Sequence, residues 1–497
     1  MEMEILTAGL PRLALIGSYL MVLAVLSIFG LHRWQLLVLT RNEKKKHRPA
    51  RPLPGPLPVV TVQLPIYNEP RVARRLLMAV ARLDYPRHLL EIQVLDDSTD
   101  HTAALLARLV ARLQRRRFQV SHLRRTCRTG FKAGALAAGL EQARGRFIAI
   151  FDADFLPPPG FLRTALPSFA ESGVGMVQAR WTHLNRRNSI LTRVQATLLD
   201  GHFLVEHLAR YGSGRFFNFN GTAGIWRREC IDTAGGWQAD TLTEDLDLSY
   251  RAQLAGWRFV FLPHLVAPAE LPAGVQAWKT QQHRWAKGSV ETARKLLPRI
   301  WRAPLSRPIR REAIFHLTAN GSYPFMVLLC LLIWPTLHLR QHGAARILAL
   351  VDLAVLGLAT ASVFVFYYRA QRRAGQGRAA SLLCLPPLLG LGAALAINNS
   401  RAVLEALLGR RSPFRRTPKE GRVDTKPGHG RPVRAQGPLP YLEGLMSLYL
   451  AATLLDAIRL GVWAWVPFIA LFLWGHVYLT VADLGQALRA WRYLPAR

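Results

Sequence analysis

Apolar runs of two lengths divide the chain. Between residues 59 and 300 the runs are short, and two of them, "LLEIQVL" and "RFIAIF", end directly in acidic residues at Asp96 and Asp152. Short apolar runs that end in polar residues predict buried β-strands. Outside this part the runs are longer, close to the roughly 20 residues that cross a bilayer as a helix. The pattern predicts an α/β fold class for the first part and an α-helical transmembrane region for the rest.

The first long run covers residues 13–31 and precedes "RNEKKKHRPAR", which holds six basic residues and one Glu. Positive charge marks the cytoplasmic end of a span, so we expect the N-terminus outside, the α/β domain in the cytosol and the protein in the cell (inner) membrane. Further spans are expected at 322–337, 347–368, 441–458 and 462–484. The stretch 381–399 has basic flanks, which favours an interfacial or re-entrant helix. We predict five spans, with six as the alternative.

Three acidic residues fall within these expected spans, namely Asp352, Glu443 and Asp456. Ionisable groups in a span usually face the protein interior or a water-filled path. The alternative is a position near the lipid headgroups, which we favour for Glu443 and Asp456.

These patterns give a division of the chain into six parts. They are an N-terminal transmembrane anchor at 1–40, a basic and Pro-rich linker at 41–58, a cytosolic catalytic domain at 59–300, an interface helix and transmembrane pair at 301–369, an interfacial helix and basic loop at 370–438, and a second transmembrane pair and tail at 439–497.

The composition is basic and apolar. The 497 residues carry 65 Lys and Arg against 31 acids, a formal net charge of +34, and the mean hydropathy is +0.11. Such a charge suits nucleic acid or an anionic membrane surface. Because the Arg clusters flank apolar segments and no nucleic-acid motif is present, we expect a membrane and no nucleic acid. The four cysteines form neither a metal pattern nor a disulfide frame, which fits a reducing compartment.

The acids at the strand ends suggest a chemistry. Asp152 and Asp154 form an Asp-x-Asp pair, whose oxygens suit Mg²⁺ or Mn²⁺, an ion that shares its other positions with substrate phosphates. In an open α/β sheet the ligand lies at the carboxyl ends of the strands, where these acids are expected. Asp245 follows Thr243 and Glu244 at the start of a helical pattern. It is a candidate general base, although N-capping by Thr243 explains this cluster about as well.

A nucleotide-diphosphate sugar would use both groups. The ion would stabilise the leaving diphosphate, and a separate base would take the proton of an acceptor hydroxyl. A glycosidase would instead use two carboxylates that flank the bond and no metal. The segment "QQHRW" adds an amide, a guanidinium and an indole at Gln281, Arg284 and Trp285, which suits a sugar ring and its hydroxyls, although an Arg-Trp pair is more often plain surface packing.

Eight motifs carry a resemblance to a known family. "LPIYNEP", "DDSTD", "KAGAL", "DAD", "FNGTAGIWRR", "TEDLDLSYRAQLAGW" and "QQHRW" occur over roughly residues 55–300 in the order of the D, DxD, ED, QxxRW pattern, and "FRRTPK" follows later. The chain resembles the family 2 membrane glycosyltransferases, most of all the cellulose synthases and the plant mannan and glucan synthase-like enzymes. The resemblance implies a GT-A nucleotide-sugar-binding domain with a mixed sheet.

The resemblance also implies roles for individual residues. The base would be Asp245, with Glu244 beside it; the metal would meet Asp154 and Asp152. The donor would contact Tyr67, Glu69, Asp97, Lys132, Asp152, Gln281 and Arg284, and the acceptor would contact Trp285, Asn220, Gly221 and Thr222. "FRRTPK" is similar to the FxVTxK gating loop of cellulose synthases, with Phe414, Thr417 and Lys419 in register and Arg416 in place of Val.

The function we expect is an inverting, processive transfer of a hexose from UDP-glucose or GDP-mannose to a β-glucan or β-mannan, with export through the membrane. The alternative is a glycolipid-forming transferase that adds one or a few sugars to a membrane lipid. A third reading, a non-catalytic membrane scaffold or transporter, conflicts with the complete set of acids. The sequence suggests no regulatory extension.

Overall fold

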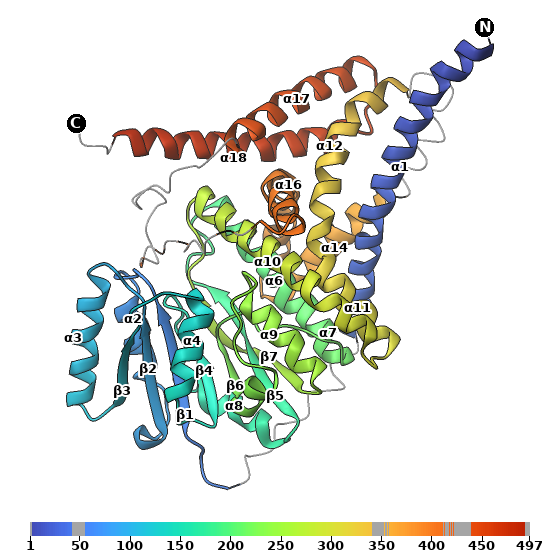
Figure 1. Ribbon diagram of the computed structural model, residues 1–497. Helices are drawn as coiled ribbons and strands as arrows, with labels where there is room; N and C mark the ends of the chain where they lie inside the picture. Colours follow the sequence, from blue (N-terminus) through green and yellow to red (C-terminus); the bar gives the residue numbers. More distant parts are fainter. Residues whose placement is uncertain are drawn as a thin grey trace.

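The computed structural model describes residues 2–41, 55–339, 352, 355, 357–410, 412, 417, 419, 421 and 439–492. An α/β domain occupies one side of the molecule, and the long helices rise from its other side (Figure 1). The two parts follow the division predicted from the lengths of the apolar runs.

The domain is built on a mixed seven-stranded sheet with the order β3-β2-β1-β4-β6-β5-β7. All neighbouring pairs are parallel except the two made by β6, which is antiparallel to both β4 and β5. The prediction of a mixed sheet is confirmed. The strands are β1 (Val60–Ile66), β2 (Leu90–Asp96), β3 (Gln119–Arg124), β4 (Phe147–Ile150), β5 (Val174–His183), β6 (Gly224–Arg227) and β7 (Arg258–Ala269).

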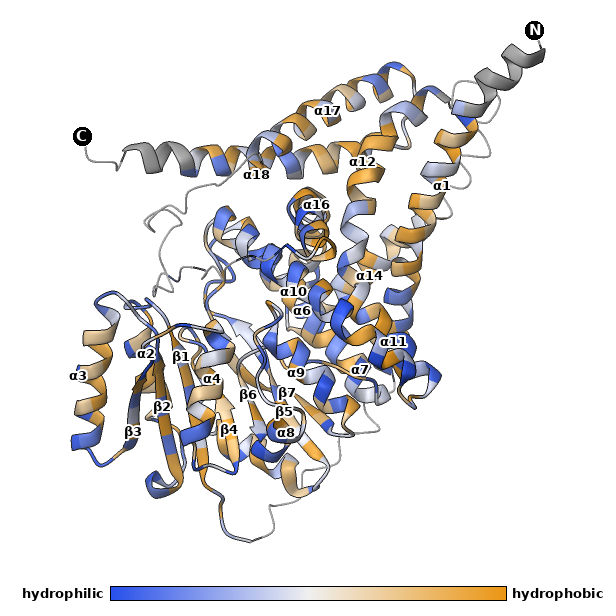
Figure 2. Cartoon of the chain, in the orientation of Figure 1, coloured by the Kyte–Doolittle hydropathy of each residue, from blue (hydrophilic) through white to orange (hydrophobic). Residues whose placement is uncertain are grey.

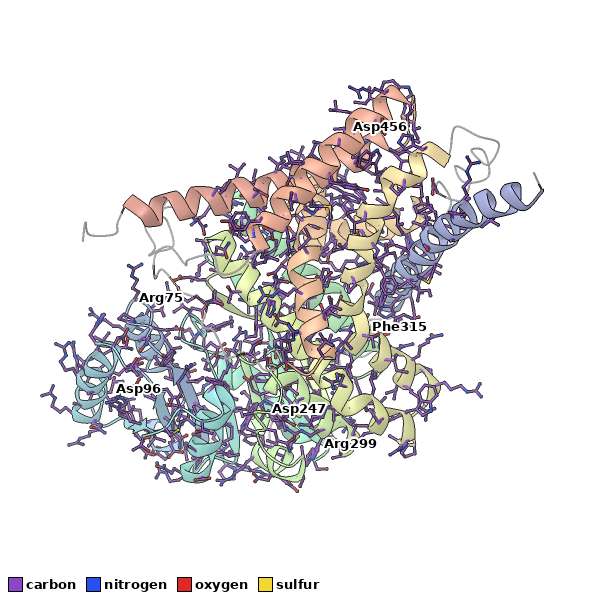
Figure 3. All side chains as sticks on the ribbon, turned by 45° about the horizontal axis from the view of Figure 1, so that its top comes forward. Arg75, Asp96, Asp247, Arg299, Phe315 and Asp456 are labelled. Atoms are coloured by element: carbon purple, nitrogen blue, oxygen red, sulfur yellow. The ribbon has the colours of Figure 1, made fainter. Side chains whose placement is uncertain are left out.

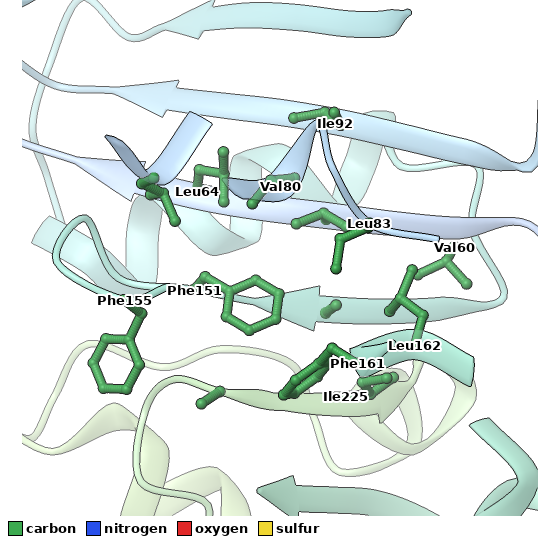
Figure 4. Packing of buried hydrophobic residues seen from close by; sticks show 14 of the residues in the cluster. Val60, Leu64, Val80, Leu83, Ile92, Phe151, Phe155, Phe161, Leu162 and Ile225 are labelled. Carbon is green, nitrogen blue, oxygen red and sulfur yellow. The ribbon is translucent and has the colours of Figure 1, made fainter. Parts of the chain in front are cut away.

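Alternation of side chains along the strands gives the sheet two apolar faces. In β4, Phe147 and Ala149 belong to one core cluster, and Ile148 and Ile150 belong to the other. Figure 4 shows the first cluster, in which Phe151 meets Phe161 of a covering helix. Because β4 is buried on both faces, it is a continuous apolar run, and the polar chain that follows it lies at the sheet edge.

Helices cover both faces and make a three-layer domain. α2 (Ala73–Val80), α3 (Thr102–Arg115) and α5 (Phe161–Ala165) pack on the first cluster. The second is covered by α4 (Phe131–Gln142), the π-helix η4 (His202–His207), α7 (Leu208–Ser213), α8 (Arg228–Thr233) and α9 (Glu244–Leu254). α6 (Ile190–Gly201) precedes η4, and the short 3₁₀ turns are η2 (Arg87–Leu89), η3 (Leu166–Ala170) and η5 (Ala319–Gly321).

The remaining helices connect the domain to the apolar region, where orange positions dominate α1, α12 and α16 (Figure 2). They are α1 (Glu2–Leu39), α10 (Val275–Arg302), α11 (Arg307–Thr318), α12 (Ser322–Leu339), α14 (Gly357–Arg373), α15 (Arg378–Leu383), α16 (Leu385–Leu407), α17 (Leu439–Arg459) and α18 (Val466–Arg492). A cluster of buried apolar side chains from α1, α12, α16, α17 and α18 holds this region together.

Five helices of the described chain are long and apolar enough to cross a membrane: Pro11–Leu39, Arg307–His338, Arg378–Leu407, Leu439–Arg459 and Val466–Gln486. Four of them overlap expected spans. The fifth contains 381–399, for which we expected an interfacial or re-entrant helix. In Figure 1 α16 is seen end-on, whereas α1 and α12 are seen along their length, so α16 runs in a different direction from these two helices. The interfacial arrangement of 381–399 stays a prediction. The first part of the expected span 347–368 lies largely outside the described residues.

The ionisable residues of the spans have partners. Glu443 is fully buried and pairs with Lys279 of α10, with Nζ and Oε1 2.7 Å apart, so it faces the protein interior, and its position near the headgroups stays a prediction. Asp352 is buried and accepts a hydrogen bond from Trp465 Nε1 at 3.1 Å. Asp456 is the partly exposed one; it accepts from Trp334 Nε1 at 2.8 Å, far from Asp96 of the sheet (Figure 3).

Candidate active site

One cavity lies at the carboxyl edge of the sheet. It is bounded by the segments that follow β1, β2, β4 and β7, by the end of β5, by the chain before β6, and by α9 and α10. Fifteen of the predicted site residues line it: Tyr67, Glu69, Asp97, Lys132, Asp152, Asp154, Asn220, Gly221, Glu244, Asp245, Gln281, Arg284, Trp285, Thr417 and Lys419. Segments up to 350 positions apart in the chain therefore meet at one place.

Tyr67 and Asp97 stand at the ends of neighbouring strands β1 and β2. The guanidinium of Arg128 lies 3.4 Å from the centre of the Tyr67 ring, and Arg125 Nε donates to Asp97 Oδ1 at 3.0 Å. A flat ring beside a fixed carboxylate can hold a nucleoside through stacking and hydroxyl contacts. Asp96, the acid before Asp97, is buried on β2 and bonds His122 instead.

Each aspartate of the Asp-x-Asp pair is held by a lysine. Lys132 Nζ lies 2.6 Å from Asp152 Oδ1 and also donates to the Gly221 carbonyl at 2.9 Å. Lys419 Nζ lies 2.8 Å from Asp154 Oδ2 and donates to the Glu270 carbonyl at 3.0 Å. Burial lowers the pKa of Lys419, but the charges of Asp154, Glu69 and Asp152 outweigh this and raise it, so the lysine is a cation.

The donor set of this pair suits a divalent ion that is shared with a substrate. Within the described part of the chain, no group of three or more His, Cys, Asp or Glu side chains could hold a metal. Mg²⁺ and Mn²⁺ need only one or two carboxylates when phosphate oxygens and water complete the coordination. Asp152 and Asp154 therefore fit a metal that binds together with a diphosphate.

Asp245 opens α9 and faces the loop before β6. Its Oδ1 accepts from the Leu246 backbone amide at 2.8 Å, and burial together with the charge of Glu244 raises its pKa to about 7. A general base works best when its pKa is close to the working pH. Thr243 is the N-cap residue of α9, but its side chain makes no capping bond, so the predicted capping by Thr243 is absent, while Asp245 itself bonds an amide of the first turn.

The QxxRW residues lie on one face of α10. Gln281, Arg284 and Trp285 are related as i, i+3 and i+4, which puts them side by side on a helix, and all three line the cavity. The positive charge of Arg284 also opposes the rise in the pKa of Asp245. The helix therefore brings a cation and a ring to the base.

Two of the three predicted acceptor-loop residues line the cavity. Gly221 has φ +79°, and a Cβ there would lie 2.9 Å from Asp245 Oδ2, so glycine is required for the close approach. Asn220 lines the cavity beside it. Thr222 does not: it is fully buried, and its Oγ1 accepts from the Asp152 amide at 2.8 Å. Thr222 holds the backbone at Asp152, and it is not among the residues that line the cavity.

Of the gating-like residues, Thr417 and Lys419 line the cavity, and Phe414 lies outside the described residues. Sequence reasoning missed several other lining residues, among them Arg128, Trp181, His183 and Glu270. Trp181 and His183 end β5, but polar residues appear in this strand from Gln178 onward, so the rule that found Asp97 and Asp152, a polar residue directly after an apolar run, does not single out His183. Arg128 lies four residues before Lys132 in a segment without a clear pattern.

The fold and site define a class: an α/β domain of the GT-A type, with acids and a metal-compatible pair at its carboxyl edge, joined to apolar helices. Residues 56–288 match the family model described as Glycosyltransferase like family 2. Over this part, which is just under half of the chain, the sequence is similar to family 2 glycosyltransferase domains.

Two plant enzymes are similar to this chain in sequence. The chain is 39% identical to glucomannan 4-beta-mannosyltransferase 1 of Oryza sativa subsp. japonica over 278 residues, 53% of each chain. It is 42% identical to glucomannan 4-beta-mannosyltransferase 2 of Arabidopsis thaliana over 250 residues, 49% of this chain and 47% of that one. The chain thus spans about half the length of these curated relatives.

A solved structure supports the fold assignment. The mannosyltransferase PcManGT from Pyrobaculum calidifontis, in complex with GDP-Man and Mn²⁺, is similar with a TM-score of 0.53 and 22% identity. The similarity covers 80% of this chain and 100% of that one. The GT-A fold predicted from the motifs is confirmed.

Proposed function

We propose that the protein is an inverting membrane glycosyltransferase that moves a hexose from a nucleotide sugar to a growing β-linked polysaccharide. The hexose we favour is mannose. The observation that carries the proposal is the convergence of Asp152, Asp154, Asp245, Arg284 and Trp285 on one cavity. These residues bring together the groups that would act on the leaving diphosphate, on the acceptor hydroxyl and on the sugar ring.

In this mechanism the donor nucleoside lies against Tyr67 and Asp97. A divalent ion held by Asp152 and Asp154 would neutralise the charge that develops on the leaving diphosphate. Gln281 and Arg284 bind the diphosphate and hold it while the bond breaks.

The acceptor sugar stacks on Trp285, and its hydroxyl faces Asp245. The carboxylate takes the hydroxyl proton as the oxygen attacks the anomeric carbon from the side opposite the diphosphate. One displacement inverts the configuration at that carbon, so an α-linked donor gives a β-linked product. The raised pKa of Asp245, about 7, suits this proton transfer at neutral pH.

The similarity to glucomannan 4-beta-mannosyltransferases supports a mannosyl donor, GDP-mannose, over UDP-glucose. Export of the polymer is part of the proposal. It is supported by α10, which carries Trp285 and packs against the apolar helix α16. The basic segment after the first apolar helix supports a cytosolic position of the catalytic domain.

The test is transfer by membranes that contain the protein, with labelled GDP-mannose or UDP-glucose and Mg²⁺ or Mn²⁺. The proposal expects an alkali-insoluble product with β-linkages, and a chloroform-soluble product would instead support the glycolipid-forming alternative. Asp245→Asn is expected to lower transfer at least about 100-fold. The matched control is Asp232→Asn, an exposed aspartate outside the cavity. Full transfer by the Asp245 variant would remove the base from the mechanism.

A further inference from the structure

The last residues of β5 include two that line the cavity and belong to none of the sequence motifs. Trp181 and His183 are two positions apart on the strand, so their side chains lie on the same face, and both line the cavity. Trp181 Nε1 and His183 Nε2 are buried, and neither atom has a hydrogen-bond partner among the described residues. Buried polar groups are rarely left unpaired in folded proteins, so two in one cavity indicate a ligand that completes them.

A third such atom is the side-chain oxygen of Asn220. Asn220 Nδ2 donates to His202 Nε2 at 2.7 Å, which fixes the orientation of the amide. The oxygen Oδ1 is then left buried and without a partner in the described chain. Three residues that line the cavity thus hold a buried indole N–H, a buried amide oxygen and a buried imidazole nitrogen without partners in the described chain.

The orientation of Asn220 is secured from behind. His202 Nδ1 donates to Glu206 at 3.1 Å, and Arg210 donates to Glu206 at 3.3 Å and to Glu312 at 3.1 Å. Glu312 is also paired at 3.0 Å with His32 of α1, the first apolar helix. Because His202 gives its own proton to Glu206, its Nε2 is the acceptor, and the amide cannot turn without losing a bond.

The chemistry of the three atoms points to hydroxyl groups. Burial and the nearby charges of Arg186, Lys419 and Arg180 lower the pKa of His183 to about 3, so its imidazole is neutral. A neutral imidazole, an indole and an amide form hydrogen bonds with hydroxyl groups, and none of the three carries a positive charge that would attract a phosphate. The aromatic ring of Trp181, packed 5.2 Å from Phe155 and 5.4 Å from Phe203, adds a rigid apolar surface. Sugars present both kinds of surface.

The position in the sheet separates this wall from the nucleoside. Along the order β2-β1-β4-β6-β5 there are four steps between Asp97 and the end of β5, or about 19 Å at roughly 4.8 Å per step. The carboxylates of Asp152 and Asp154 follow β4, between the two. Leu199 of α6 also lines the cavity, and α6 packs on the apolar helices α16 and α18.

We propose that Trp181, His183 and the Asn220 amide oxygen form a subsite for the acceptor end of a β-linked hexose chain. One sugar hydroxyl donates to Asn220 Oδ1, another accepts from Trp181 Nε1, and His183 bonds a third. The subsite lies on the opposite side of the metal carboxylates from the nucleoside and makes these residues determinants of acceptor choice. This inference rests on the proposed function.

Direct binding tests the subsite without requiring transfer. Full-length protein in lipid nanodiscs is titrated with β-1,4-linked mannohexaose, and binding is followed by calorimetry. Trp181→Phe keeps the ring that packs on Phe155 and Phe203 but removes the N–H, and His183→Phe removes the imidazole. Each is expected to weaken binding about tenfold, with the affinity for GDP unchanged within about twofold. The control is Trp237→Phe, which deletes an equally buried and unpartnered indole N–H outside the cavity.

The outcomes separate the two proposals. If the wild type binds the oligosaccharide and both variants bind it equally well, or lose GDP instead, the subsite is refuted while the proposed transfer can still be found in the membrane assay. If the wild type binds no mannohexaose or cellohexaose, the subsite is likewise refuted. Weaker oligosaccharide binding in both variants but not in the Trp237 control supports the subsite even if the donor proves to be a different nucleotide hexose.

Discussion

Lys279 of α10 is enclosed by two carboxylates from the C-terminal helix pair. Its Nζ lies 2.7 Å from Glu443 of α17 and 2.8 Å from Asp483 of α18, and all three side chains are at most 2% exposed. The lysine stands two residues before Gln281 on the same helix. The two ion pairs therefore fasten the helix of the QxxRW residues to the apolar helices.

Lys279→Met would remove the cation and leave two acids facing each other without water. Breaking a buried pair from one side costs about 3–5 kcal/mol, because the remaining charge stays desolvated. In a chain of this size that corresponds to a fall in the melting temperature on the order of 5 °C. Because Gln281, Arg284 and Trp285 depend on the position of α10, we expect transfer activity to fall as well.

Thermal unfolding in detergent, followed by intrinsic fluorescence, measures the effect. Arg299→Met is the control on the same helix, because Arg299 is exposed and its loss should cost about 1 kcal/mol or less. A triple variant that adds Glu443→Gln and Asp483→Asn should recover at least half of the loss, since its amides can bond each other. The reasoning fails if Lys279→Met melts within about 1 °C of the wild type, or if the triple variant is less stable than the single one.

The remaining predictions concern the cavity. Asp245 has a pKa of about 7 and must be ionised to act, so kcat/KM should fall as the pH drops below 7; Glu244→Gln removes the neighbouring charge and should move this acid limb down by about 1 pH unit, measured in a pH profile. Chelation by EDTA should abolish transfer and Mn²⁺ should restore it. Lys419→Met should tighten the binding of Mn²⁺ without donor about tenfold, measured by paramagnetic resonance, since its ammonium competes for Asp154; unchanged binding would contradict this. Gly221→Ala should lower kcat at least tenfold, because its Cβ would meet Asp245 and the backbone has φ +79°, whereas unchanged kcat would show that the loop can adjust.

Much of the site could be read from the sequence because local rules fix it. Asp97 and Asp152 end apolar strands, parallel strands end at one edge, and the spacing of Gln281 and Trp285 puts them on one helical face. Each inference needs only the neighbours in the chain. The same rule does not single out His183, because β5 carries polar residues from Gln178 onward and ends without an acid.

What the sequence withheld depends on packing between distant segments. Lys279 resembles any helix lysine until α17 and α18 bring Glu443 and Asp483 to it. The pairing of Glu443 with Lys279 could not be predicted for the same reason, because hydropathy indicates where a helix can cross a membrane and not which side chains it contacts. The role of 381–399 is undecided by composition in the same way: α16 is apolar enough to span, and its direction follows from its contacts with α10 and α12.

The ion pair between Asp154 and Lys419 joins the segment after β4 to the segment between α16 and α17 at the candidate metal site. The Lys419 ammonium lies 2.8 Å from the Asp154 carboxylate that a divalent ion would use. The ammonium also donates to the Glu270 carbonyl, and the Glu270 amide donates to Asp154 Oδ2. Two cations cannot both approach one carboxylate oxygen so closely without strong repulsion. A divalent ion bound at Asp154 with the proposed donor would therefore have to displace Lys419 or share the carboxylate with it. Binding of the donor would then be coupled to the position of the Lys419 ammonium, and by linkage a change that fixes Lys419 would also change the affinity for the donor.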